Sequence, residues 1–139
     1  MIAATALALV FALELKAVVS TDIKCLTEAI YFEARGEEVS GQIAVANVVK
    51  NRTKSYNKTY CDVVHQKGQF SYYWDKISNK YKDKAAFMQA RTLARSLIEN
   101  KIPDNTNGAV FFKKKGVRSA AFKKLKHTMR LGNHDFYAV

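Results

Sequence analysis

The sequence predicts one α+β domain that is mostly helical and carries a small antiparallel β-sheet near its C-terminus. Apolar residues recur at helical spacing up to about residue 100, and a turn dipeptide, Gly132-Asn133, separates two short segments at the end of the chain. The chain has 139 residues, which suffice for one hydrophobic core and leave no room for two ordinary domains. Its composition, 48% hydrophobic with a single proline, is typical of a packed globular domain.

The N-terminal segment has the composition of an export signal. Residues 2–13 form an apolar run rich in alanine, which is short for a bilayer span but fits the apolar region of a secretory signal. Val18-x-Ser20 would serve as the cleavage site, although no Lys or Arg precedes the run. We predict that residues 1–20 are a signal or N-terminal anchor and that residues 21–139 form the functional domain. The alternatives are an amphipathic or buried helix of the mature fold, or a weak anchor that later releases.

A first helix is expected over residues 22–35, because Ser20 or Thr21 is a good N-cap and Gly36 is placed to end it. One face of this helix combines three apolar residues with a carboxylate, namely Ile23, Leu26, Ile30 and Glu33. The carboxylate therefore continues a stripe that should face the core.

The remaining elements follow in order. Residues 40–54 and 83–100 predict two more helices, the second stopped by Pro103, and residues 62–65 predict a helical turn after a polar turn over 53–60. Asn107-Gly108 leads into a short strand over 109–112. The segments 128–131 and 134–138 should pair as a hairpin around Gly132-Asn133.

Charge indicates an acidic partner. The net charge is +11, and eight Lys and Arg residues lie between positions 113 and 130, with no acidic residue between Asn105 and His134. Nucleic acid, an anionic lipid surface and the carboxylate-rich bacterial wall would all be attracted.

The two cysteines, Cys25 and Cys61, form no CxxC pair or zinc-finger pattern, so we expect no metal site. In an exported chain they could close a disulfide worth roughly 3–4 kcal/mol in the loop-entropy model. In a reducing cytoplasm they would remain two buried thiols.

The stretch from Cys25 to Arg52 reads CLTEAIYFEARGEEVSGQIAVANVVKNR. It resembles the signature region of the SleB/CwlJ cell-wall hydrolases, with a Y-x-E-A-R-G-E core followed by GQ-x-AVA-x-V-x-x-NR. Further landmarks occur in the same order as in that family. They are a VCxVV-like spacing over 61–64, GQFS and a tryptophan within 68–74, GAVFF at 108–112 and GNHDFY at 132–137. The resemblance covers about residues 23–137. It departs from the family pattern in the unclear export signal and in a lysine-rich loop after Trp74.

The resemblance implies a lysozyme-like fold and cleavage of the MurNAc-GlcNAc bond of peptidoglycan, in characterised members as lytic transglycosylases. It implies no cofactor, a monomer, and a place in the periplasm or cell wall, where the enzyme could also serve a phage against its host. We further expect contact with the anionic wall or membrane surface and no nucleic-acid partner. The catalytic glutamate of the family falls on Glu33.

Glycosidic cleavage needs a carboxylic acid that is still protonated near neutral pH, and a glutamate on an apolar helix face has its pKa raised by loss of water. In a transglycosylase the same carboxylate then takes the proton of the C6 hydroxyl, so that a 1,6-anhydro ring forms. A hydrolase would instead use a second carboxylate, for which Asp62, Asp75 and Glu37 are candidates.

Substrate contacts are expected from the aromatic loop over residues 68–75, whose Gln69, Ser71 and Trp74 combine flat apolar and hydrogen-bonding groups. Tyr31 and Tyr137 could line the same groove, although a buried tyrosine with a satisfied hydroxyl is the ordinary alternative for each.

Two rival functions are weighed against this one. A zinc amidase would need ligands converging from His65, His127, His134 and acids, yet no ligand-spaced histidine pair exists. A nucleic-acid-binding module would use the basic segment with Phe111 and Phe112 as stacking residues.

Overall fold

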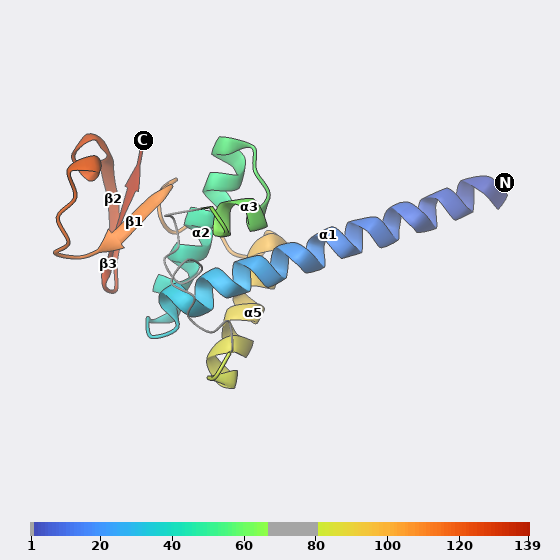
Figure 1. Cartoon of the computed structure of the whole chain (residues 1–139), viewed down its shortest axis with the longest axis horizontal. Helices are drawn as coiled ribbons and strands as arrows, with labels where there is room; N and C mark the ends of the chain where they lie inside the picture. The colour runs from blue at the N-terminus through green and yellow to red at the C-terminus, as the bar shows by residue number, and fades with distance from the viewer. Residues whose placement is uncertain (1, 67–80) are drawn as a thin grey trace.

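The computed structural model describes residues 2–66 and 81–139, and side chains from residue 5 onward within those ranges. Its helices are α1 (Ile2–Ala34), α2 (Val39–Tyr56), α3 (Tyr60–Val64) and α5 (Lys84–Ile98). They are followed by β1 (Phe111–Lys114), a 3₁₀ turn η1 (Ala120–Lys124), β2 (Lys126–Leu131) and β3 (His134–Ala138). The predicted fold class, mostly helical with a small C-terminal antiparallel sheet, is confirmed (Figure 1).

Helix α1 runs without a break through the point where a new helix was predicted to begin. The expected N-cap at Ser20 or Thr21 is wrong, because the Thr21 hydroxyl donates back to the carbonyl of Ala17 at 2.9 Å and the helix continues. Alanine and leucine before this point are strong helix formers and outweigh the capping signal. The predicted end is confirmed, since α1 stops at Ala34, two residues before Gly36.

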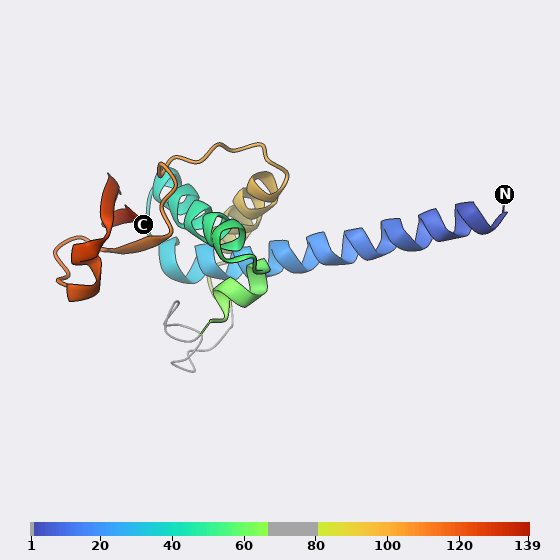
Figure 2. The same ribbon diagram turned by 90° about the horizontal axis from the view of Figure 1, so that it is seen from above.

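The N-terminal half of α1 projects away from the rest of the molecule (Figures 1 and 2). Every side chain from residue 5 to 20 is exposed, so this segment is not buried, although it does continue as one helix with the residues that follow, as the alternative interpretation expected. No helix among the described residues is long and apolar enough to cross a membrane. Its role as a signal or anchor remains a prediction.

The main core forms where the C-terminal half of α1 meets α2, α3 and α5. Leu26 and Ile30 of α1 are fully buried against Val49 of α2 and Leu97 of α5. The apolar stripe predicted for this helix is therefore the face that packs, and it leads along α1 to Glu33 near the helix end.

The sheet has the strand order β1-β3-β2 and is antiparallel throughout. Its first strand begins at Phe111 rather than at 109, while the hairpin forms around Gly132, whose φ of +58° suits a residue without a side chain. One face packs on α2, with Phe136 fully buried against Val45 and Val48. This packing holds the hairpin beside the end of α1.

Polar residues of α2 fasten the loop that leads to the sheet. Asn47 donates to the carbonyl of Pro103 at 3.4 Å, and Asn51 donates to Asp104 and to the carbonyl of Ala109 at 3.0 and 2.9 Å. Helix α2 extends to Tyr56, two residues beyond its predicted end, so the polar turn predicted from residue 53 begins later. Asn47 and Asn51 thus have a structural role, because they hold this loop against α2.

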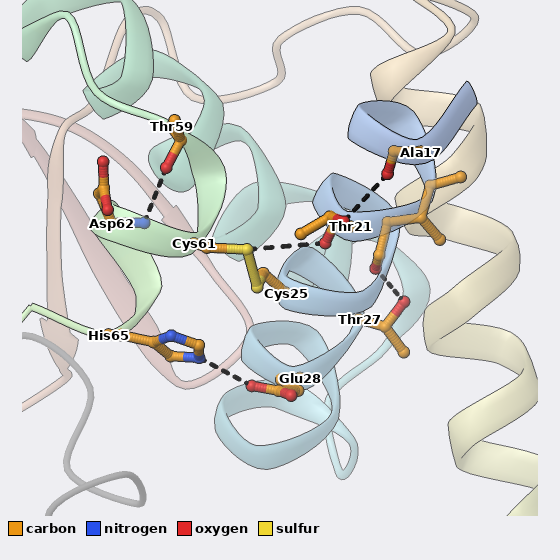
Figure 3. The surroundings of a disulfide bond; sticks show 10 residues. Ala17, Thr21, Cys25, Thr27, Glu28, Thr59, Cys61, Asp62 and His65 are labelled. Carbon is orange, nitrogen blue, oxygen red and sulfur yellow. Dashed lines mark hydrogen bonds and ion pairs between the residues drawn. A yellow bond between two sulfur atoms is a disulfide. The ribbon is translucent and has the colours of Figure 1, made fainter. Parts of the chain in front are cut away.

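Cys25 and Cys61 form a disulfide with an S–S distance of 2.06 Å, joining α1 to α3 (Figure 3). Nearby, Thr59 caps α3 by accepting a hydrogen bond from the Asp62 amide at 3.0 Å. His65 at the end of α3 lies 3.1 Å from Glu28 of α1. These contacts fix α3 against the buried half of α1.

Candidate active site

A pocket of about 420 Å³ opens where α1 ends, and we call it the Glu33 pocket. It is lined by Glu33, Gly36, Glu37, Lys114, Lys115, Asn133 and His134. These residues come from the end of α1, the loop before α2, the end of β1 and the β2–β3 turn. Two of the motifs on which the family resemblance rests, FEARGE and GNHDFY, therefore both contribute residues to the Glu33 pocket, although they lie about a hundred residues apart in the sequence.

Glu33 is half-buried at the C-terminal end of α1. Burial raises the pKa of its carboxyl above the ordinary value of 4.5, and the positive charge of Lys114 opposes part of this rise. A carboxyl that remains protonated further toward neutral pH, and that still reaches a pocket, can donate a proton to a bound molecule.

Glu37 fastens the β2–β3 turn to the end of α1. Its Oε2 accepts a hydrogen bond from the Asn133 amide at 3.4 Å, and its Oε1 lies 3.3 Å from Nδ1 of His134. A Cβ on Gly132 would come within 2.5 Å of Oε2, so any larger residue there would force this carboxylate to move. The side chain of Glu37 is only 11% exposed.

His134 lines the pocket beside Lys114, its partner across β1 and β3. Burial lowers the pKa of His134, the negative charge of Glu37 opposes this, and Lys114 lowers it further. The imidazole is therefore held toward its neutral form. It packs edge-on against Phe112 with ring centroids 5.2 Å apart.

Apart from the two tyrosines and the two cysteines, the predicted site residues separate into three groups. Glu33 and Glu37 line one pocket, which brings together the predicted catalytic group and one candidate for a second carboxylate. Asp62 lies exposed on α3 near the disulfide and does not line the pocket. Gln69, Ser71, Trp74 and Asp75 lie outside the described residues.

The two tyrosines predicted to contact substrate do not line the Glu33 pocket. Tyr31 is 0% exposed, and its hydroxyl accepts hydrogen bonds from Arg35 at 2.7 Å and from the Asp83 amide at 3.0 Å. This is the buried, satisfied tyrosine of the alternative interpretation, so direct contact with substrate is not supported for Tyr31. Tyr137 lies on β3 and lines a different pocket, with Lys113 and Phe122.

Sequence reasoning missed Lys114, Lys115 and Asn133 as lining residues. The lysines were treated as members of one basic segment, although neighbouring strand residues point to opposite faces. If the strand before residue 115 had been paired with the strand in GNHDFY, Lys114 would have been placed next to His134. That pairing would have identified Lys114 as a pocket residue.

The histidines do not converge as an amidase site would require. His65 pairs with Glu28, His127 with Asp135 and His134 with Glu37. In the part of the chain that the structure describes, no group of three His, Cys, Asp or Glu side chains could hold a metal ion.

A second hollow, of about 620 Å³, lies between α1 and α5 and is lined by Leu15, Val19 and Phe87 among others. It is mainly apolar and does not include Glu33. Its mainly apolar lining favours apolar contacts, whereas the smaller Glu33 pocket combines a half-buried acid with cations. Chemistry rather than size therefore identifies the candidate active site.

A half-buried glutamate that ends a core helix and opens into a polar pocket is chemically suited to give a proton to a bound molecule and to take one from it. The model of the cell wall hydrolase family matches residues 36–137, which is more than half of the chain. The chain therefore belongs to the cell wall hydrolase family, as an enzyme of the SleB/CwlJ type. The matched region begins three residues after Glu33, so the family match does not include that residue.

Two solved structures have a similar fold. The catalytic domain of the germination-specific lytic transglycosylase SleB from Bacillus anthracis aligns with a TM-score of 0.68 and 24% identity, covering 84% of this chain and 93% of that one. The catalytic domain of the Bacillus cereus SleB protein aligns with a TM-score of 0.67 and 24% identity, covering 86% and 91%. No curated protein matched the chain in the sequence comparison.

Proposed function

We propose that the protein cleaves the MurNAc-GlcNAc bond of peptidoglycan as a lytic transglycosylase, with Glu33 as its one catalytic carboxyl. The observation that carries the proposal is the position of Glu33, half-buried at the end of α1, open to a pocket and with a pKa raised by burial. Membership in the cell wall hydrolase family and a fold shared with a lytic transglycosylase support the substrate and the reaction.

The reaction needs one group that first gives and then takes a proton. Protonated Glu33 donates its proton to the glycosidic oxygen as the bond from that oxygen to C1 of MurNAc breaks, and the GlcNAc hydroxyl leaves. The Glu33 carboxylate then removes the proton of the C6 hydroxyl of MurNAc, whose oxygen bonds to C1. A 1,6-anhydro ring results, no water is consumed, and Glu33 is protonated again.

Lys114 suits the second half of this cycle. Its positive charge favours the carboxylate form of Glu33, whereas burial favours the acid form, and the two influences oppose each other. A carboxyl balanced in this way can exchange a proton in both directions during one turnover.

The test is the substitution Glu33→Gln, which keeps the size and polarity of the side chain and removes its proton transfer. We expect clearing of purified peptidoglycan to fall at least about 100-fold, the scale of general acid–base catalysis. Glu38→Gln is the matched control, because Glu38 is an exposed carboxylate five residues further along that does not line the pocket. Full activity of a folded Glu33→Gln variant would overturn the proposal.

A two-carboxylate hydrolase is a second candidate, favoured by one observation, that Glu37 lines the same pocket as Glu33. The products separate the two mechanisms, because a transglycosylase leaves anhydro-muramic ends and a hydrolase leaves hydrated ones. Mass spectrometry of a wild-type digest should show anhydro ends only. Hydrated ends, together with loss of activity in Glu37→Gln, would favour the hydrolase.

We propose that the enzyme acts outside the cytoplasm as a monomer, in the periplasm or cell wall. The Cys25–Cys61 disulfide supports this location, because such bonds persist in oxidising compartments. The net charge of +11 supports contact with the anionic wall or membrane surface rather than with a basic partner.

A further inference from the structure

The two faces of the C-terminal sheet present different residues. In the register of the sheet, Lys113 lies opposite Asp135, which in turn lies opposite Arg130. Because side chains alternate along a strand, this row projects from the face opposite to the one that carries Lys114 and His134. The inner face thus packs on α2 and reaches the Glu33 pocket, while the outer face carries its own set of charged residues.

A pocket of about 870 Å³ lies on this outer face, and we call it the outer-face pocket. Its lining combines four cations with aromatic rings and one acid, chiefly Lys113, Arg118, Lys123, Arg130, Tyr137 and Asp135. A volume of this order is typical of sites that hold a small ligand or one group of a larger one.

The single acid of this pocket is already paired. Asp135 accepts two hydrogen bonds from Arg130, at 2.7 and 2.9 Å, and lies 3.0 Å from Nε2 of His127. The hydrogen bonds from Arg130 hold the pKa of Asp135 well below its usual range. The Asp135 carboxylate is thus engaged by Arg130 and does not balance the remaining cations.

Those cations face the pocket with little opposing charge. Within residues 2–66 and 81–139, no acidic side chain forms an ion pair with Arg118 or Lys123. Lys113 is held in place, since its Nζ donates to the carbonyl of Val117 and lies 6.0 and 5.8 Å from the ring centroids of Phe122 and Tyr137. The two rings meet edge to face with centroids 4.9 Å apart and form an aromatic wall.

We propose that the outer-face pocket is a second binding site of the enzyme, separate from the Glu33 pocket, which takes the carboxylate groups of wall peptide stems. The inference rests on the proposed function only in naming peptidoglycan as the polymer. Arg118 and Lys123 bind the carboxylate, and the Phe122–Tyr137 wall packs against the apolar part of the peptide. Because the pocket and Glu33 lie on opposite faces of the sheet, the enzyme stays bound to the wall while a glycan strand enters and leaves the Glu33 pocket.

The test measures binding apart from cleavage. Sedimentation with insoluble peptidoglycan is measured in a Glu33→Gln background, so that the polymer is not digested, with and without Arg118→Gln/Lys123→Gln. We expect the double change to weaken binding about fivefold to tenfold at low salt, the scale of two exposed charge contacts, and to reduce the salt dependence of binding. Lys54→Gln/Lys84→Gln is the matched control, because it removes two exposed cations from α2 and α5.

Peptidoglycan from which an amidase has removed the peptide stems identifies the ligand. With it, the difference between the two proteins should vanish. A difference that persists on stem-free glycan, or that appears only on walls carrying phosphate polymers, would overturn the assignment to peptide carboxylates. Equal binding of both proteins to intact peptidoglycan would overturn the site itself.

Cleavage is measured separately, with Glu33 intact, on a short soluble glycan fragment without peptide stems. Arg118→Gln/Lys123→Gln should leave that rate unchanged, since neither residue lines the Glu33 pocket. A loss of cleavage by Glu33→Gln that is not accompanied by weaker binding of the double variant would support the proposed function and refute the second site. The two proposals can therefore fail independently.

Discussion

The two halves of helix α1 both carry apolar residues but have opposite surroundings. Leu9 in the N-terminal half is 66% exposed, whereas Leu26 in the C-terminal half is 0% exposed, and no break in the helix separates them. Strong helix formers sustain the helix in both halves, but only the second half meets α2, α3 and α5. Residues within the helix thus decide whether the helix forms, whereas the elements packed against it decide which of its side chains are buried. The raised pKa of Glu33 depends on that burial.

The largest effect we expect compares one substitution in the two halves. Leu26→Ala should lower the free energy of unfolding by about 2–5 kcal/mol, because it leaves a cavity among packed side chains. Leu9→Ala should change it by less than about 0.5 kcal/mol, since an exposed leucine loses little when truncated. Urea denaturation of both variants, followed by circular dichroism, measures the difference. A large loss of unfolding free energy in Leu9→Ala would mean that the projecting half is covered in solution, which would contradict its exposure in this structure.

The disulfide gives the next largest effect, because it joins α1 to α3 just where the buried half of α1 begins. Replacing both cysteines, Cys25→Ser/Cys61→Ser, should lower the free energy of unfolding by about 3–4 kcal/mol in the loop-entropy model, for partners 36 residues apart. Denaturant unfolding of the variant and of oxidised wild-type protein gives the value. Wild-type protein unfolded with a reductant present is the control and should match the variant. Equal stability of all three would show that α3 is held by its other contacts alone.

The sequence predicted the buried half of α1 well and its start poorly. Periodicity identified Leu26 and Ile30 as core residues, and both are buried. Apolar residues at helical spacing lie on one face of the helix, and that face packs against the core. The start at Ser20 or Thr21 was wrong because a local capping signal is worth only about 1 kcal/mol and cannot stop a run of strong helix formers. Spacing within one helix also singled out Glu33.

Residues that depend on register between distant strands could not be predicted in the same way. Lys113 and Lys114 are neighbours in one basic run, yet one lines the outer-face pocket and the other the Glu33 pocket. A shift of one residue in strand pairing would exchange them, and nothing local in the sequence fixes that register. Tyr31 and Tyr137 differ for a similar reason, since long-range packing buries the first and leaves the second on the outer face.

The smallest effect concerns what burial of Glu33 costs the fold. Its pKa is raised in the folded protein, so as pH increases past about 4.5 the unfolded chain loses this proton before the folded one does, and stability falls until the folded pKa is passed. Glu33→Gln carries no such proton and should therefore be more stable than wild type at neutral pH, with the gain disappearing below pH 4 or so. Thermal unfolding of both proteins across this range measures it. Glu38→Gln, which alters an exposed carboxylate outside the Glu33 pocket, is the control variant for the loss of one negative charge. A gain that is the same at every pH would mean that the substitution improves packing rather than relieving a buried charge, and it would contradict a raised pKa of Glu33 in the folded protein.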